Sequence, residues 1–292
     1  MLASSAASLA AQLGLGLALS SLIGVVAYRR RALSRSGVWG AILIGTLIFG
    51  FGGWTAGLLL IAFFVSSSAL SHFKERDPRK QRAAEMFEKG GQRDWWQALA
   101  NGGAAAALAV GSSALANVEP NAANALFAAM VGALATVNAD TWATELGVLS
   151  PTPPRRITRL SQVVVPGTSG GITAIGTLAA LSGALFIGVL HALLGLAFGS
   201  PLRASALAVA GLAALGGLGG ALFDSMLGAT VQAMYYSERR QKETEKPFER
   251  DGTPNRHVRG WRWMNNDWVN FLASLFGAAL TAALWLWTQT AR

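Results

Sequence analysis

Long apolar runs separated by short polar connections make up most of the sequence. The runs are about 20 residues long, the length that a helix needs to cross the hydrocarbon core of a bilayer. They predict an all-α fold, a polytopic membrane bundle of eight transmembrane helices. The predicted helices are residues 7–28, 37–53, 54–73, 95–116, 121–146, 168–198, 203–236 and 267–288. Adjacent glycines at 52–53 predict a very tight turn between the second and third helices.

Positive charge is concentrated in four of the polar connections. Residues 29–36, 74–94, 147–167 and 237–266 hold 4, 7, 3 and 8 of the lysines and arginines, which is 22 of the 24 in the chain. Lysine and arginine near helix ends are retained on the cytoplasmic side, and eight helices place these four connections together. We therefore expect cytoplasmic loops, both termini outside, and a location in the cell (inner) membrane. This topology accounts for the net charge of +9 without nucleic-acid binding.

Composition agrees with a membrane protein and excludes some kinds of site. The chain is 52% hydrophobic and 13% charged, whereas soluble domains carry about 25% charged residues. Its 34 glycines are typical of membrane helices that approach closely. The chain has no cysteine, which excludes disulfide bonds and thiolate metal sites.

Acidic residues interrupt two of the predicted helices. Asp140 and Glu145 lie near the cytoplasmic end of the fifth helix, and Asp224 lies in the seventh. An ionisable side chain at the bilayer centre costs about 2.5–3.5 kcal/mol, so these residues are expected to have a function or a partner. Helical spacing places Asp140 on one face with Thr136, and Asp224 on a glycine-rich face, which predicts that both point into the bundle. For Asp140 and Glu145, a role as interfacial cap or ion-pair partner stays open.

The seventh predicted helix is longer than a membrane requires. The Gly-Gly-Leu-Gly-Gly run at 216–220 is therefore expected to break it and to leave Asp224 beside an unwound turn. Asp224 would then lie about twelve residues, or about 18 Å of helix, before the polar end.

A glycine-, threonine- and serine-rich loop, VVVPGTSGGITAIG at residues 163–176, leads into the sixth helix. Free N–H groups at a helix N-terminus, with the positive end of the dipole behind them, bind phosphate oxygens. The pattern predicts a phosphate cradle formed by Gly167, Thr168, Ser169, Gly170 and Gly171. The loop lacks the ending of a P-loop and a GxGxxG motif, so an ordinary loop in which Thr168 or Ser169 caps the helix stays open.

The remaining candidates are polar residues at the same helix ends or in the connections between them: Arg93, Asn101, Arg155, Arg156, Asn266 and Asp267. Every unusual polar group of helices four to eight thus lies toward the cytoplasmic side, which predicts one site. Carboxylates, amides, arginines and an anion-binding loop together indicate phosphate chemistry supported by Mg²⁺, which prefers one or two carboxylates plus substrate phosphates.

Five segments occur in order along the chain: GQRDWWQALANGG, NADTWATELGVLS, VVPGTSGGIT, FDSMLGATVQ and NNDWVNF. They resemble an integral-membrane family that includes the plant phytyl-phosphate kinase of the tocopherol pathway and animal transmembrane protein 19. The resemblance covers about residues 66–275. The ADTWA and GTSGG segments also resemble, more distantly, motifs of the CTP-using polyprenol and dolichol kinases.

The resemblance implies a Mg²⁺-dependent kinase that transfers the terminal phosphoryl group of a nucleoside triphosphate, CTP above all, to an isoprenyl monophosphate such as phytyl phosphate. Asp140 and Asp224 would hold the metal, and Glu145 would be a further ligand or would support them. Asn101, Asn266 and Asp267 would contact nucleotide or metal. The acceptor phosphate would meet Arg93 or the arginines at 155–159. The chain forms one domain, with amino-terminal helices at 1–65 and catalytic helices and loops at 66–292; a homo-oligomer stays open.

Two other classes of function remain. Buried carboxylates and cytoplasm-facing anion sites are also typical of a membrane transporter or a flippase for an anionic lipid, although carriers usually place such groups near the midplane. A prenol kinase or a CDP-lipid-forming transferase would keep the same site and change the acceptor.

Overall fold

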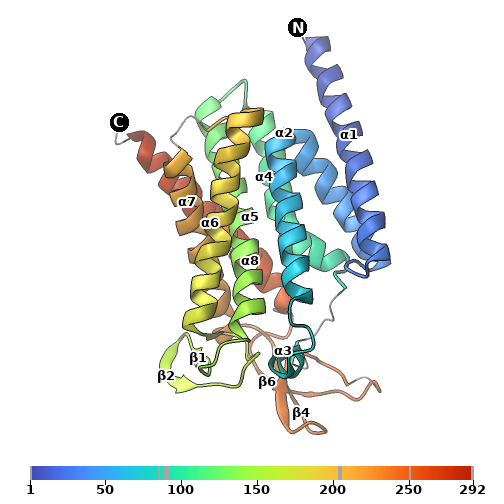
Figure 1. Cartoon of the computed structure of the whole chain (residues 1–292), viewed down its shortest axis with the longest axis vertical. Coiled ribbons are helices and arrows are strands. Elements are labelled where there is room, and N and C mark those ends of the chain that lie inside the picture. Colours follow the sequence, from blue (N-terminus) through green and yellow to red (C-terminus); the bar gives the residue numbers. More distant parts are fainter. Residues whose placement is uncertain (1, 85, 88–91, 203–205, 250, 291–292) are drawn as a thin grey trace.

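The computed structural model describes residues 2–84, 86–87, 92–202, 206–249 and 251–290 (Figure 1). Its helices are α1 (Leu2–Arg29), α2 (Arg35–His72), α3 (Pro78–Ala84), α4 (Trp95–Leu115), α5 (Pro120–Gly147), α6 (Ala174–Phe198), α7 (Ala206–Thr230) and α8 (Asn266–Thr290). Its short strands are β1 (Arg155–Arg156), β2 (Arg159–Val163), β3 (Gly171–Ile172), β4 (Met234–Ser237), β5 (Lys242–Thr244) and β6 (Arg256–Arg259).

Seven of these helices, all except the short α3, are long and apolar enough to cross a membrane. They are not equally enclosed. In the apolar 18-residue stretch of α5, 83% of the residues are buried inside the protein, against 11% for α1. Accordingly, α5 lies within the bundle and α1 at its edge (Figure 1). The predicted fold class, a polytopic helical membrane bundle, is confirmed.

The helix α2 contains two of the predicted crossings. Gly53 has a non-helical backbone, with φ 69° and ψ −164°, and it bends the helix. Both ends of α2 meet Arg93: Ser34 donates its N–H to the Arg93 carbonyl at 3.0 Å, and Arg93 Nη1 donates to Ser68 Oγ at 3.1 Å. The element α2 therefore consists of two helical arms that run out and back, and they are joined at Gly53, where the sequence predicts a tight turn (Figure 1).

Two other helices differ from their predicted bounds. The helix α6 begins at 174 instead of 168, because Gly167 and Gly170 have φ values of 90° and 80° that a right-handed helix does not use. The helix α7 is continuous, so the prediction that the run at 216–220 breaks it is wrong. It also ends at 230, so Asp224 lies six residues, about 9 Å, from the polar end, rather than twelve.

One chain path occurs twice in the carboxy-terminal part of the bundle. After α5, the chain forms a three-stranded antiparallel sheet in the order β2-β1-β3 and returns as α6. After α7, it forms a sheet in the order β5-β4-β6 and returns as α8. In both sheets the first strand is central. We call residues 120–198 repeat A and residues 206–290 repeat B. Helices α5 and α7 pack against each other and against both outer helices, α6 and α8.

Close helix packing seals the bundle interior where the two repeats meet. Thr136 of α5 lies where a Cβ atom on Gly220 of α7 or on Gly277 of α8 would overlap its side chain. Glycine at both positions therefore lets α7 and α8 contact α5 directly. The glycines at 216–220 of α7 are explained by such close packing against neighbouring helices rather than by helix unwinding.

The four polar connections meet at one end of the bundle, while α1 begins and α8 ends at the opposite end (Figure 1). Contacts join these connections to one another. Arg79 Nη1 donates to the Leu149 carbonyl at 2.6 Å, and Thr244 Oγ1 donates to the Met86 carbonyl at 3.0 Å. The two cations outside these connections, at 203 and 292, lie outside the described residues.

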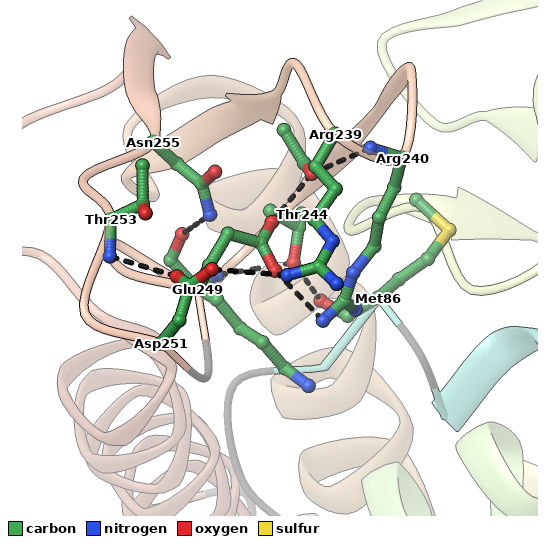
Figure 2. A network of polar contacts seen from close by, with 10 residues as sticks. Met86, Arg239, Arg240, Thr244, Glu249, Asp251, Thr253 and Asn255 are labelled. Carbon is green, nitrogen blue, oxygen red and sulfur yellow. Dashed lines mark hydrogen bonds and ion pairs between the residues drawn. The ribbon is translucent and has the colours of Figure 1, made fainter.

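The connection between β4 and β6 is ordered by its own polar contacts (Figure 2). Glu249 accepts a hydrogen bond from Ser237 Oγ at 2.5 Å and forms an ion pair with Arg240 at 2.9 Å. Asp251 pairs with Arg239 at 3.0 Å. The Ser237 hydrogen bond, together with Arg240, holds the pKa of the Glu249 carboxyl below its ordinary value. Several charges of this loop thus satisfy one another outside the cavity described next.

Candidate functional site

A cavity of about 820 Å³ lies among the polar connections and the helix ends that they join. Twelve of the predicted site residues line it: Arg93, Asn101, Asp140, Glu145, Gly167, Thr168, Ser169, Gly170, Gly171, Asp224, Asn266 and Asp267. Arg155 and Arg156 do not line it. Arg155 Nη1 donates instead to the Leu160 carbonyl at 2.8 Å, within the hairpin of β1 and β2. Both repeats and the preceding helices therefore contribute to one polar space.

Asp140 and Asp224 occupy matching positions in the two repeats. Helices α5 and α7 run in the same direction and touch where Gly220 meets Thr136. Each aspartate follows this contact by four residues, about one helical turn. Both aspartates line the same cavity, as expected for carboxylates on facing sides of two packed helices. The two repeats thus place two acids side by side at the inner wall of the cavity.

These carboxylates have no protein partner in the part of the chain that the structure describes. Neither aspartate forms a hydrogen bond or ion pair there, and Asp224 Oδ2 is buried without one. Two neighbouring half-buried carboxylates favour a cation or a proton between them. Among the described residues, no three His, Cys, Asp or Glu side chains are placed to hold a metal by themselves. A pair of carboxylates beside an open cavity fits Mg²⁺, which completes its coordination with water and substrate phosphates.

Glu145 has a different environment from the two aspartates. Lys80 Nζ lies 2.6 Å from Glu145 Oε2, and Ser71 Oγ donates to Oε1 at 2.6 Å. Lys80 also donates to the Leu70 carbonyl at 2.7 Å, and its side chain is 8% exposed. Glu145 therefore holds α3 against the ends of α2 and α5. It is an ion-pair partner, the alternative that the sequence leaves open.

Glu245 is an acidic residue of the cavity that the sequence does not single out. It follows β5, lines the cavity and is 8% exposed. Gln232 Nε2 donates to its carboxylate at 2.9 Å, and Gln232 Oε1 accepts a hydrogen bond from Ser169 Oγ. The charge of Glu245 also acts on Asp224. This chain of contacts links the glycine-rich loop of repeat A to the polar connection of repeat B.

Close packing explains two glycines of the loop before α6. A Cβ atom on Gly167 would come within 2.9 Å of the Ala83 backbone in α3. A Cβ atom on Gly170 would come within 2.5 Å of the Ala229 nitrogen at the end of α7. Both glycines also have positive φ, which other residues adopt at a cost. The loop is therefore held between α3 and α7.

The backbone of this loop is only partly available to a ligand. Thr168 and Gly171 donate their N–H groups to carbonyls within the loop. The predicted five-residue phosphate cradle is thereby reduced to the N–H groups of the other three residues. Thr173 caps α6, because its Oγ1 accepts the Gly176 N–H at 2.9 Å. The alternative in which Thr168 or Ser169 caps the helix is wrong.

Arg93 lies where the cavity meets the apolar interior. Its guanidinium lies 5.4 Å from the centre of the Phe64 ring and 6.0 Å from that of Phe63. Burial lowers the pKa of Arg93, and the charge of Glu145 acts in the opposite direction. A cation in these surroundings favours an anionic partner.

The helices α4 and α8 begin in similar ways at the cavity. Asp94 caps α4 and Asn265 caps α8, each through a side-chain oxygen that accepts an N–H of the first turn. These caps fix the helix starts that carry the lining residues Asn101, Asn266 and Asp267. The amides predicted at two separate points of the sequence thus share one wall.

The chain is similar to a described family of membrane proteins and to several known proteins. Residues 18–278 match a family described as "Integral membrane protein DUF92". Protein PGR of Arabidopsis thaliana is 36% identical over 275 residues, which cover 90% of this chain and 93% of that protein. An uncharacterized membrane protein of Methanocaldococcus jannaschii is 29% identical over 259 residues, covering 89% and 88% of the two chains. One of Synechocystis is 27% identical over 256 residues, covering 84% and 81%.

No solved structure matches this chain. The matched region includes all the candidate residues of both repeats. The names of the relatives state a membrane location at most and give no enzymatic activity.

Proposed function

The chain belongs to the DUF92 family of integral membrane proteins, and on this premise we propose that it is a phosphotransferase. It transfers the terminal phosphoryl group of a nucleoside triphosphate to an isoprenyl monophosphate. One observation carries the proposal: the carboxylates of Asp140 and Asp224, which have no partner among the described residues, line a polar cavity that also holds a half-buried cation, Arg93. The two aspartates can bind a metal ion and Arg93 can bind a phosphate, a combination that suits phosphoryl transfer.

The proposed transfer needs positioning more than proton chemistry. An oxygen of the acceptor phosphate attacks the terminal phosphorus, and the bond from that phosphorus to its bridging oxygen breaks. The nucleoside diphosphate leaves with the bonding electron pair, and the isoprenyl diphosphate forms. No general base is required, because the acceptor phosphate is already anionic near neutral pH.

Each wall of the cavity has a part in this scheme. Arg93 holds the acceptor phosphate, and the loop at 167–171 holds nucleotide phosphates through its remaining N–H groups. Asp140 and Asp224 would hold Mg²⁺, which when bound neutralises charge on the transferring group. The polar starts of α4 and α8 contact the nucleotide. CTP is the first nucleotide to test, because of the resemblance to CTP-using kinases.

The packing beneath the aspartates favours an enzyme over a carrier. Below Asp140 and Asp224, helices α5, α7 and α8 are in direct contact around Thr136. A carrier must open its central site to both faces in turn, whereas this cavity adjoins the polar end. A prenol kinase or a CDP-lipid-forming transferase would use the same cavity and is separated from the proposal by its product.

The same scheme assigns a side of the membrane. The polar end that surrounds the cavity holds the four connections rich in lysine and arginine, so it would face the cytoplasm, where nucleoside triphosphates are available. Both termini would then lie outside the cytoplasm, in the cell (inner) membrane. Labelling of cysteines introduced into the connection at 237–255 and near the carboxyl end of α8 would distinguish the two orientations.

The direct experiment incubates purified protein in nanodiscs with Mg²⁺, one nucleoside triphosphate, and phytyl, farnesyl or geranylgeranyl phosphate. Mass spectrometry is expected to detect the isoprenyl diphosphate with at least one nucleotide. Asp140→Asn should lose this product, whereas Asp251→Asn, an acid paired with Arg239 in the outer loop, should retain it. Absence of product for every pair would contradict the proposal.

Other outcomes of this experiment identify the alternatives. Phosphorylation of a free prenol would indicate a prenol kinase, and a CDP-lipid would indicate the transferase. Movement of a fluorescent anionic lipid between leaflets without chemical change would indicate a flippase.

A further inference from the structure

A second, smaller cavity adjoins the polar one. It has a volume of about 100 Å³ and lies between α1, the two arms of α2, and α4. Its walls are mainly apolar side chains: Leu19, Ile23, Ile44, Phe49, Phe63 and Phe64. We call this space the apolar groove. Arg93, Gln97 and Asn101 line both the groove and the polar cavity, so the two spaces meet at these residues.

Arg93 is a fixed cation at this junction. Its N–H donates to the Ala32 carbonyl at 3.0 Å, and its own carbonyl accepts the Ser34 N–H at 3.0 Å. Its guanidinium donates to Ser68 and forms no ion pair with any residue that the structure describes. A half-buried cation that lies against two phenylalanine rings is partly shielded from water, and an anionic ligand at this point would supply the charge partner that it lacks among the described residues.

We infer that the apolar groove holds the proximal part of the isoprenyl chain of the acceptor, with the acceptor phosphate on Arg93. This inference rests on the proposed function, because it assigns a place to the acceptor of that reaction. The groove is too small for a whole phytyl chain, so the distal part lies in the bilayer. The phosphate then projects into the polar cavity, toward the side where Asp140 and Asp224 lie.

The junction also selects among ligands. An isoprenyl monophosphate offers one apolar chain and one compact anion, which matches one groove and one cation. A free prenol would leave Arg93 without an anion, and inorganic phosphate would leave the groove empty. Of the arginines predicted from the sequence to meet the acceptor phosphate, Arg93 lines the cavity and Arg155 and Arg156 do not.

The test measures the binding of farnesyl phosphate in the absence of nucleotide, by native mass spectrometry of the full-length protein in nanodiscs. Arg93→Gln is expected to weaken binding about tenfold or more, because it removes the charge partner. Ala41→Leu fills the groove and is expected to weaken farnesyl phosphate binding to a similar degree. The binding of inorganic pyrophosphate, which has no apolar chain, should not change. Ala18→Leu makes the same change at an exposed position of α1 and should bind as the wild type does.

The outcomes separate this inference from the proposed function. Asp251→Asn, which changes an acid of the outer loop, is expected to retain farnesyl phosphate binding. If no nucleotide supports transfer but binding depends on Arg93 and Ala41 as described, the groove stands and the kinase proposal fails. The groove is overturned if Ala41→Leu binds as tightly as the wild type, or if phosphatidic acid displaces farnesyl phosphate with equal affinity. If Arg93→Gln does not fold, the binding of farnesol to the wild-type protein is measured instead. An affinity for farnesol equal to that for farnesyl phosphate would show that Arg93 does not bind the phosphate.

Discussion

In repeat A and repeat B the chain follows the same path to the cavity, but the polar connections of the two repeats differ. In repeat A the connection is compact, and its glycines lie against α3 and α7. In repeat B the connection is longer, is ordered by its own ion pairs, and places Glu245 at the cavity. Each repeat nevertheless provides, at the matching position of α5 or α7, one aspartate that has no partner within the described part of the chain.

The difference separates two kinds of residue. The packed helices α5 and α7 fix the two aspartates relative to each other. Substitutions in these helices should therefore disturb the aspartate of each repeat at the same time. The connections differ because they surround different parts of the ligand, so changes there should have smaller and unequal effects. The following variants test this division, beginning with the largest expected effect.

Removal of either aspartate should affect turnover most. In Asp140→Asn and Asp224→Asn one charge of the pair is lost, and kcat is expected to fall at least about 100-fold. The unfolding temperature is not expected to fall, because like-charge repulsion is relieved. Steady-state kinetics and thermal unfolding measure the two effects. A large loss in only one variant would show that the repeats do not act as a pair.

Gly170→Ala should have the next largest effect, since it displaces the loop of repeat A from α7. The added Cβ would meet the Ala229 backbone, and the residue has φ 80°. A destabilisation of about 1–3 kcal/mol is expected, with a raised KM for the nucleotide. Gly252→Ala is the matched control: its φ is 85°, but no atom lies within 4 Å of its added Cβ. Equal effects in the two variants would attribute the loss to backbone strain alone.

The contact between Glu145 and Lys80 should contribute to stability more than to chemistry. Glu145→Gln and Lys80→Met each break the pair and are expected to destabilise the protein by about 1–3 kcal/mol. The double variant should lose less than the sum of the single losses, as in a double-mutant cycle. Activity should fall only a few-fold in each. Loss of turnover in Glu145→Gln comparable to that of Asp140→Asn would instead make Glu145 a metal ligand.

The smallest expected effect concerns pH and the outer loop of repeat B. Because the pKa of Glu249 is lowered in the folded loop, its carboxylate contributes stability above its unfolded pKa, and that contribution is lost as pH falls through the folded value. Protection against hydrogen exchange at 237–255, measured relative to the intrinsic exchange rate at each pH, should therefore fall in acid, and Glu249→Gln should remove this pH dependence of the protection. An unchanged pH profile in the variant would exclude Glu249 as the group responsible.

The membrane helices could be predicted because each is an apolar run of the length that a bilayer requires. Glycine was harder to interpret. The run at 216–220 has the composition of a helix break, yet it is a packing surface for α5 and α8, and only the neighbouring helices distinguish the two. The strands were not predicted, because segments of two to five residues such as β2, exposed throughout, carry no alternating pattern.

Most candidate residues could be placed together from the sequence, because topology assigns them to one end of the bundle. Their contacts could not be placed. Arg155 and Arg156 belong to a hairpin beside the cavity. Glu245 lies in a charged loop, and no feature of the sequence distinguishes it from the exposed charged residues near it. Lys80, which pairs with Glu145, is 65 positions away along the chain. The duplicated chain path could not be recognised in the sequence, because the two repeats resemble each other only weakly, in ADTWATE at 139–145 and FDSMLGA at 223–229.

In the proposed mechanism, the aspartates of the two repeats hold one divalent cation together. Mn²⁺ can replace Mg²⁺ as a spectroscopic probe, and its binding can be followed by electron paramagnetic resonance in the presence of a non-hydrolysable nucleotide. The wild type is expected to bind Mn²⁺ at a site that both Asp140→Asn and Asp224→Asn abolish. Binding that survives in both variants, or is lost in only one of them, would contradict a shared site.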